Sequence, residues 1–307
     1  MTDKNKKILF IAIPVAVVVI AALIVGAIFL FGDANDTYRI VKVYRVDGNA
    51  EVQKAAGDVM KPYENMLLEN NDSVKTLENG YLYLKLDEDK YLLAEPDANF
   101  SLIATGDAQN SKTRIEIKNG SVVVHVTKAL SEDSSFEIGA GKSTMAVRGT
   151  SFRVSVTEDE QGNVASSVEV FEGEVSVQPV QPNGSTSQPT SVTAGQAAVV
   201  DQNGEVEKTT EGVVLENLDD KALEFLKVAI ENGKDVGADA DEIDRIIANR
   251  QKTFTVTFVF DGKVFATERV AYGETATRPT LMPAPTGNWD FDFATPITSD
   301  VTVNWIE

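Results

Sequence analysis

The sequence predicts a mainly β protein with one transmembrane helix, an all-β domain, a helical hairpin and a small C-terminal module. Short segments of alternating apolar and polar residues recur between Tyr38 and about Val200, which is the pattern of half-buried strands. Two segments with helical spacing follow, and a second group of alternating segments occupies residues 252–307. An uncharged apolar run at residues 8–31 precedes all of them.

The apolar run at residues 8–31 predicts the transmembrane helix. A helix of this length reaches about 36 Å, and a bilayer core is about 30 Å thick. The preceding residues 1–7 hold three lysines and one aspartate, which predicts a short cytoplasmic tail. The alternative is a cleaved signal peptide, whose apolar region is normally shorter. We therefore expect a single-pass cell-membrane protein with an extracellular C-terminal ectodomain.

The amino-acid composition limits which partners the protein can bind and which kinds of reactive or metal site it can contain. The chain has 28 Lys and Arg against 47 Asp and Glu, a net charge of −19, which repels nucleic acid. It has no cysteine, which excludes disulfides, thiolate nucleophiles and cysteine-ligated zinc. The segment after the apolar run is about 275 residues long, so it should divide into two or three modules with separate cores.

Residues 37–210 are predicted to form the all-β domain. Its clearest strand is Tyr81–Leu86, in which three leucines alternate with two tyrosines and a lysine. The dipeptide Asn119-Gly120 predicts a tight hairpin between strands at 114–118 and 121–127. A Pro-, Gly-, Ser- and Thr-rich segment at 178–191 predicts a long surface loop. Further strands are expected at 38–46, 50–54, 72–76, 91–93, 136–138, 151–156, 168–171, 174–177 and 192–200.

Several motifs of this domain resemble the FecR domain. The most specific is the run Val147-Arg148-Gly149-Thr150 followed by Phe152. The segments Asp72–Thr76, Ser135–Ile138, Val170–Val175 and Thr193–Gln196 resemble the same family. The resemblance covers about residues 45–200 and implies an extracytoplasmic β fold with a binding or sensing role.

The chain departs from the family pattern in two places. Asn71-Asp72 stands where the family usually has Gly-Asp, which implies a local change of turn. FecR sensors of the iron-uptake type have a cytoplasmic segment that acts on a sigma factor, and residues 1–7 are too short to form one. The resemblance therefore implies a sensing fold without sigma-factor control by this chain.

Arg148 is the candidate site residue of the motif, and two interpretations are open. It could contact an anion or another ligand, or it could be a structural residue that binds strand carbonyls or a carboxylate, with Gly149 allowing close backbone approach. An acidic domain offers many partners for one arginine, which favours the structural interpretation. The same role is expected for Val147, Thr150 and Phe152.

No motif predicts an enzyme. Gly139–Thr144 is similar to the end of a phosphate-binding loop, but Phe136 stands where that loop requires its first glycine. His125 is the only histidine, and its place on the polar face of a predicted strand suggests a solvated side chain. A nucleophile elbow of the G-x-S-x-G type is absent. We expect no catalytic residue, no cofactor and no metal site.

Residues 216–250 predict a helical hairpin. Its helices are expected at Asp219–Asn232, starting on Asn217 or Asp219 and ending before Gly233, and at Ala240–Arg250, with Asp239 as N-cap. Such short helices are marginal alone, so they should lie against each other or against the β domain.

Residues 252–307 resemble the internalin-type B repeat of bacterial surface proteins. The similarity rests on two runs, Val270–Thr275 and Trp289–Trp305. It implies a β-grasp-like module. The step Gly287-Asn288 before Trp289 is shorter than usual, so the Trp289 ring could be partly exposed and contact a partner. The alternative is a tryptophan in the module core.

Together these features predict a membrane-anchored bacterial surface protein without enzymatic activity, which binds an extracellular or envelope component. The membrane itself would be contacted through residues 8–31. The alternative function is an envelope sensor that passes a signal to a membrane partner through its single helix.

Overall fold

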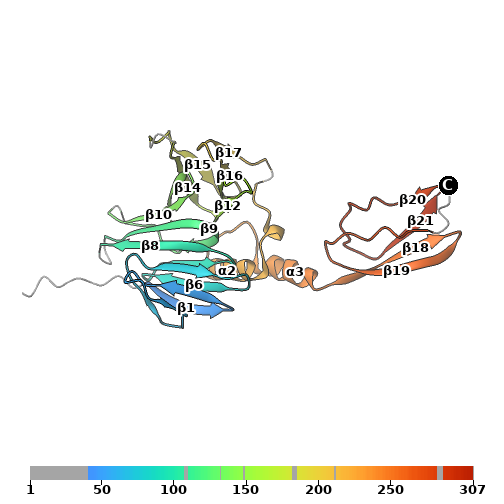
Figure 1. The fold of residues 1–307 in the computed structure, drawn as a ribbon, viewed down its shortest axis with the longest axis horizontal. Helices are drawn as coiled ribbons and strands as arrows, with labels where there is room; N and C mark the ends of the chain where they lie inside the picture. Colours follow the sequence, from blue (N-terminus) through green and yellow to red (C-terminus); the bar gives the residue numbers. More distant parts are fainter. Residues whose placement is uncertain are drawn as a thin grey trace, which may run out of the picture.

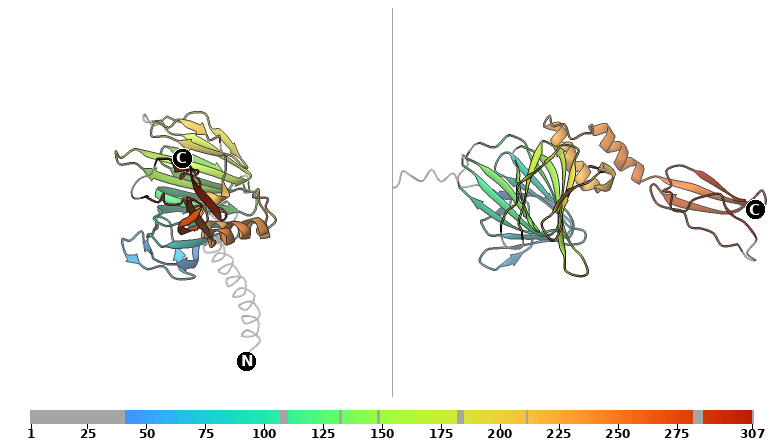
Figure 2. Two further views of the ribbon diagram at one scale, coloured as in Figure 1. Left: turned by 90° about the vertical axis from the view of Figure 1, so that its right-hand side faces the viewer. Right: turned by 90° about the horizontal axis from the view of Figure 1, so that it is seen from above.

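The computed structural model describes residues 41–106, 110–131, 133–147, 149–181, 185–210, 212–281 and 286–306. Figure 1 shows three parts along the chain: a large β-sandwich, a pair of short helices and a small sheet that extends away from the sandwich. Seen from above in Figure 2, the helices lie on one side of the sandwich, and the small sheet follows the second helix.

The first sheet of the sandwich, here called sheet A, contains nine strands. Their order across the sheet is β4-β1-β6-β7-β9-β12-β13-β16-β17, and all neighbours are antiparallel. The strands are β1 (Val41–Asp47), β4 (Leu67–Leu68), β6 (Tyr81–Leu86), β7 (Lys90–Ala94), β9 (Lys112–Val126), β12 (Ser151–Glu158), β13 (Val164–Glu172), β16 (Ala197–Val200) and β17 (Val206–Lys208).

The second sheet, sheet B, has the order β3-β2-β5-β8-β9-β10-β11-β14-β15. Its neighbours are antiparallel except β9 and β10, which are parallel. The strands that belong to this sheet alone are β2 (Ala50–Gln53), β3 (Val59–Met60), β5 (Ser73–Thr76), β8 (Asn99–Thr105), β10 (Ser135–Ala140), β11 (Ser143–Val147), β14 (Glu174–Pro179) and β15 (Thr190–Thr193).

Strand β9 belongs to both sheets, which corrects the hairpin predicted at Asn119-Gly120. Its first half pairs with β8 and β10 in sheet B, and its second half pairs with β7 and β12 in sheet A. Gly120 has a φ of +81°, and a Cβ there would lie 2.6 Å from the Asp97 carbonyl oxygen. The dipeptide therefore allows one long strand to pass from sheet to sheet beside a neighbouring backbone, and it does not reverse the chain.

The main core lies between the two sheets. The leucines predicted to share one face of Tyr81–Leu86 are fully buried, which confirms that alternation. Phe100 and Phe136 enter the core from sheet B, and Phe152 enters it from sheet A; each is at most 1% exposed. Burial of apolar side chains from both sheets is the main stabilising term of such a sandwich.

The two predicted helices are confirmed as α2 (Asp220–Glu231) and α3 (Ala240–Arg250), after a 3₁₀ turn at Leu215–Asn217. Asp219 is the N-cap of α2 and accepts a hydrogen bond from the Ala222 backbone N–H at 2.7 Å. Asp239 caps α3 in the same way.

A second core joins α2 to the outer face of sheet A. The buried helix residues recur at positions i, i+3, i+4 and i+7, which place them on one side of α2. The sheet contributes Tyr83, Leu93, Val123 and Phe171. The hairpin therefore lies against the β-sandwich as well as against itself.

The C-terminal sheet has the order β19-β18-β21-β20, with β18 and β21 parallel. Its strands are β18 (Thr253–Phe260), β19 (Lys263–Ala271), β20 (Asn288–Trp289) and β21 (Val301–Ile306). Val256, Phe258 and Val303 form its core together with Trp289 and Ile297.

The predicted fold class needs two corrections. The described part of the chain is mainly β with two short α-helices, and it contains no helix with the length and apolarity that a membrane crossing requires. Residues 8–31, which carried the prediction of a transmembrane helix, lie outside the described residues. The β-grasp comparison extends only to the parallel pair β18–β21, because the described residues of the C-terminal module include no helix over the sheet.

Candidate functional site on the outer face of sheet A

The predicted motif forms the crossing from sheet B to sheet A. Val147 ends β11, Phe152 lies in β12, and Gly149 between them has a φ of +71°. The fully buried Thr150 hydroxyl donates a hydrogen bond to the Glu174 carbonyl oxygen at 2.9 Å. These four residues hold the two sheets in register at the crossing.

Arg148 lies outside the described residues, so both interpretations of its side chain stay predictions. Gly149 stands close to the neighbouring loop, because a Cβ there would lie 3.2 Å from the Ala129 Cα. This tight approach shows why a glycine follows the arginine.

Trp289 has no exposed ring to offer a partner. It is 4% exposed, its Nε1 donates to the Pro279 carbonyl oxygen at 3.3 Å, and its ring meets Phe258 and Trp305 edge to face. The step Gly287-Asn288 allows this packing, because Gly287 lies against the Trp305 indole where a Cβ would clash. The structure favours the core alternative.

The outer face of sheet A holds a cluster of charged side chains that the sequence motifs did not single out. Arg153 on β12 donates to Glu95 at 2.7 Å, to Glu169 at 3.0 Å and to the Ser121 hydroxyl at 3.1 Å. Glu95 is only 4% exposed, and this burial raises its pKa although Arg153 opposes the shift. One guanidinium thus bridges two carboxylates that would otherwise repel each other.

Arg153 and Glu169 form part of the floor of a cleft of about 570 Å³ beside the helical hairpin. One side of the cleft is the sheet itself, and the other is the chain that leads from β17 towards α2. Both polar and apolar residues line the cleft. Further lining residues are Ser167, Ala198, Val199, Lys208, Thr209 and Asn217.

His125 is buried, which corrects the expectation of a solvated side chain. It is 1% exposed, it stacks on Tyr91, and its Nδ1 lies 2.8 Å from the Ser151 hydroxyl. Burial is the main reason that its pKa falls from 6.5 to about 4, and the Lys234 ammonium acts in the same direction. The histidine is therefore neutral near pH 7.

The contact between His125 and Ser151 joins a base to a hydroxyl, as in a nucleophilic site. Ser151 is fully buried, and His125 Nε2 is also buried and has no hydrogen-bond partner among the described residues. A hydroxyl so buried is closed to a substrate, and no carboxylate of the described residues bonds to the histidine. The pair is built as a core contact rather than as a catalytic dyad.

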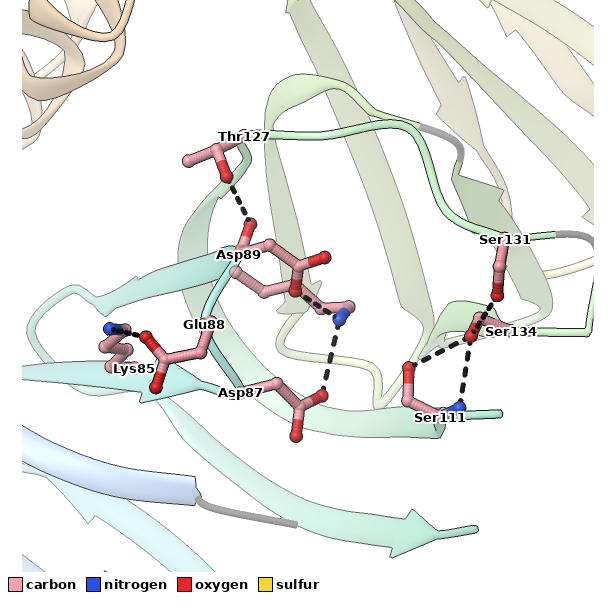
Figure 3. A network of polar contacts seen from close by, with 9 residues as sticks. Lys85, Asp87, Glu88, Asp89, Ser111, Thr127, Ser131 and Ser134 are labelled. Carbon is pink, nitrogen blue, oxygen red and sulfur yellow. Dashed lines mark hydrogen bonds and ion pairs between the residues drawn. The ribbon is translucent and has the colours of Figure 1, made fainter. Parts of the chain in front are cut away.

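A second charged cluster lies at the turn between β6 and β7 (Figure 3). Lys90 is 2% exposed, and its ammonium bonds to Asp89 at 2.6 Å and to Asp87 at 3.3 Å. The Thr127 hydroxyl donates to the Asp89 carbonyl oxygen at 3.1 Å, which ties this turn to the end of β9. Two carboxylates compensate one buried ammonium, so the cluster is a structural clamp.

The sequence gives only a weak signal for these clusters. Arg153 and Glu95 lie 58 positions apart. Arg153 stands on β12, whose alternation predicts an exposed side chain, and Glu95 follows the end of β7. Acidic residues are too common in this chain to single out Glu95. In the described ranges, no group of three or more His, Asp or Glu side chains is arranged to hold a metal ion.

Comparison with protein families matches residues 72–176 to the FecR protein family. None of the curated proteins matches the chain. Two similar solved structures are crystal structures of candidate anti-sigma factors from Parabacteroides distasonis. One is 18% identical with a TM-score of 0.37, over 46% of this chain and 60% of that chain. The other is 12% identical with a TM-score of 0.38, over 76% of this chain and 98% of that chain. The family match at residues 72–176 identifies a FecR-like domain within the β-sandwich.

Proposed function

We propose that the protein is a non-enzymatic envelope signalling protein whose FecR-like domain passes a signal to a protein partner. The match of residues 72–176 to the FecR family is the observation on which this proposal rests. The cleft beside the helical hairpin supports it, because a ligand there would touch both the sandwich and the chain that leads into α2. Binding of this ligand would thereby change the position of the hairpin relative to the β-sandwich.

The proposed division of the chain is a FecR-like domain at residues 37–210, a helical hairpin at 216–250 and a separate module at 252–307. We place this protein outside the cytoplasm at the cell membrane. Its acidic surface and its lack of cysteine suit an exported protein that folds without disulfides.

The C-terminal module is proposed to be an internalin-type B repeat that holds the signalling domain at a distance from its surroundings. Its two tryptophans contact each other with ring centroids 5.3 Å apart, and Phe258 joins them. A compact aromatic core in so small a sheet suits a repeat that folds as an independent unit.

Transcript analysis tests the signalling function. Deletion of the gene in the bacterium that encodes it should change the transcripts of a limited gene set under envelope stress, and the wild-type gene should restore them. Unchanged transcripts, together with retained binding of the purified protein to envelope material, would show that the protein only binds.

The cleft offers a matched pair of variants for the same experiment. Ser167→Trp should fill the cleft and fail to restore the transcripts, because Ser167 lies on its wall. Ser191→Trp places the same ring on an exposed position of β15 in sheet B and should restore them. If both variants restore the transcripts equally, the cleft has no role in signalling.

A further inference from the structure

The surface of sheet A beneath the hairpin has the composition of a protein-binding surface. Tyr44, Tyr81, Tyr83 and Tyr91 gather there from neighbouring strands, around the apolar side chains that meet α2. The rings of Tyr44 and Tyr83 and those of Tyr44 and Tyr91 meet edge to face, with centroids 5.7 and 6.1 Å apart. Tyrosine is enriched at protein interfaces because its ring is apolar and its hydroxyl can be hydrated.

The hairpin leaves some buried polar groups of this surface without hydrogen-bond partners. The Tyr83 hydroxyl, His125 Nε2 and Glu172 Oε2 are buried, and none of them has a hydrogen-bond partner among the described residues. Each lies on the side of sheet A that the hairpin covers, because Tyr83 meets Phe225 of α2, and Lys234 after α2 acts on His125 and Glu172. Buried polar groups without partners weaken a contact, and water would hydrate them if the hairpin moved away.

Few other interactions hold the hairpin in place. Between the described residues of hairpin and sheet, the polar contacts are Tyr81 to Asp219 at 3.0 Å and Lys234 to Glu172 at 3.3 Å. Helix α3 has one fully buried side chain, Ile243. The remaining attachment is apolar: the buried side of α2, with Leu218, Val236 and Ile243, lies in the core shared with sheet A.

We propose that the hairpin is an internal competitor, and that the tyrosine-rich face beneath it binds an amphipathic helix of a signalling partner. This inference rests on the proposed signalling function and names its partner class. The partner helix would carry apolar residues at i, i+3, i+4 and i+7, as α2 does at Ala222, Phe225, Leu226 and Ala229. Its first turn would be acidic, because Tyr81 binds the carboxylate of Asp219 at the start of α2 and Arg45 stands over the Tyr83 ring.

A peptide with the sequence of residues 216–234, labelled with fluorescein, serves as the probe for the full chain. Only molecules whose hairpin has moved away can bind the peptide. The apparent affinity of the peptide is therefore its intrinsic affinity multiplied by the fraction of such open molecules. Leu226→Ala loosens α2 and should strengthen binding at least tenfold. Tyr83→Phe removes one unpaired hydroxyl from the face that α2 and the peptide both cover, so it stabilises the closed state and the complex alike and should leave the affinity near the wild-type value. Leu77→Ala changes an exposed leucine outside this face and should leave the affinity at the wild-type value.

Equal peptide affinities for the wild type and Leu226→Ala would overturn the proposal. Equal binding of a peptide with serine at positions 223, 225 and 226 would also overturn it. Hydrogen exchange provides a measurement without mutation: α2 amides of the wild-type chain should exchange faster than those of β9 and β12, and equal protection would contradict a displaceable hairpin. Because the probe comes from the chain itself, these results do not depend on whether the protein signals.

Discussion

At the scale of single residues, the burial of His125 makes stability depend on pH. Its folded pKa of about 4 lies below the ordinary 6.5, so the unfolded chain binds a proton first as the pH falls. The stability that neutral His125 contributes is present above pH 6.5 and is lost between pH 6.5 and about 4. The loss is roughly 3 kcal/mol for a shift of this size.

His125→Asn should flatten this part of the pH dependence, measured by urea unfolding at pH 7 and pH 4.5. The raised pKa of Glu95 acts in the other direction, because its folded state keeps the proton longer and loses stability as the pH rises past its ordinary value. The difference between wild type and variant therefore isolates the histidine. An identical slope in both proteins would show that His125 gains a proton in the folded state as readily as in the unfolded chain.

Arg153 offers a second prediction at this scale. Arg153→Met leaves Glu95 buried without its guanidinium and should lower the free energy of unfolding by about 3–5 kcal/mol. Glu95→Gln in the same chain should recover part of this loss, because the uncompensated charge is gone. Additive effects of the two substitutions in a double-mutant cycle would show that the two side chains do not interact.

At the scale of elements, the cap of α2 connects the helix to sheet A. Asp219→Ala removes both the cap and the partner of the Tyr81 hydroxyl, so it should lower stability by about 1 kcal/mol and speed amide exchange in α2. Asp239→Ala removes the cap of α3. Among the described residues this carboxylate has no hydrogen bond to sheet A, so the substitution should leave exchange in α2 nearly unchanged. Equal effects of the two variants on α2 would argue against a specific role of Asp219.

Elements with a strong local signal were predictable. The alternation of Tyr81–Leu86 and the Asp239 cap of α3 follow from spacing and residue type alone, whereas the start of α2 stayed open between Asn217 and Asp219 until the structure showed Asp219. Asn71 has a φ of +69°, a conformation that asparagine adopts more readily than most residues, so it can replace the usual glycine before Asp72.

Other features depend on contacts that are distant in sequence. Asn119-Gly120 looks like a hairpin turn, yet the backbone near Asp97 and the pairing with two sheets make it a passage within β9. His125 and Arg153 occupy positions that alternation marks as exposed, and the covering hairpin comes about a hundred positions after His125. The alternation within one strand cannot show that a segment distant in sequence covers its outer face.

At the scale of the whole molecule, separate cores predict separate unfolding transitions. Both tryptophans, Trp289 and Trp305, belong to the C-terminal core, so tryptophan fluorescence reports the unfolding of this module alone. Its midpoint should differ from that of far-UV circular dichroism, which the larger sandwich dominates. Trp289→Ala should unfold the module and leave the sandwich transition in place, whereas loss of both transitions would show a shared core.

The measurement that tests the central claim most directly compares transcripts in cells that carry Leu226→Ala or the control Leu77→Ala at equal protein levels. The gene set that responds to deletion should shift with the loosened hairpin and stay at the wild-type level with the control. If Leu226→Ala leaves these transcripts at the wild-type level, or if both variants shift them equally, the hairpin on sheet A does not control the signal.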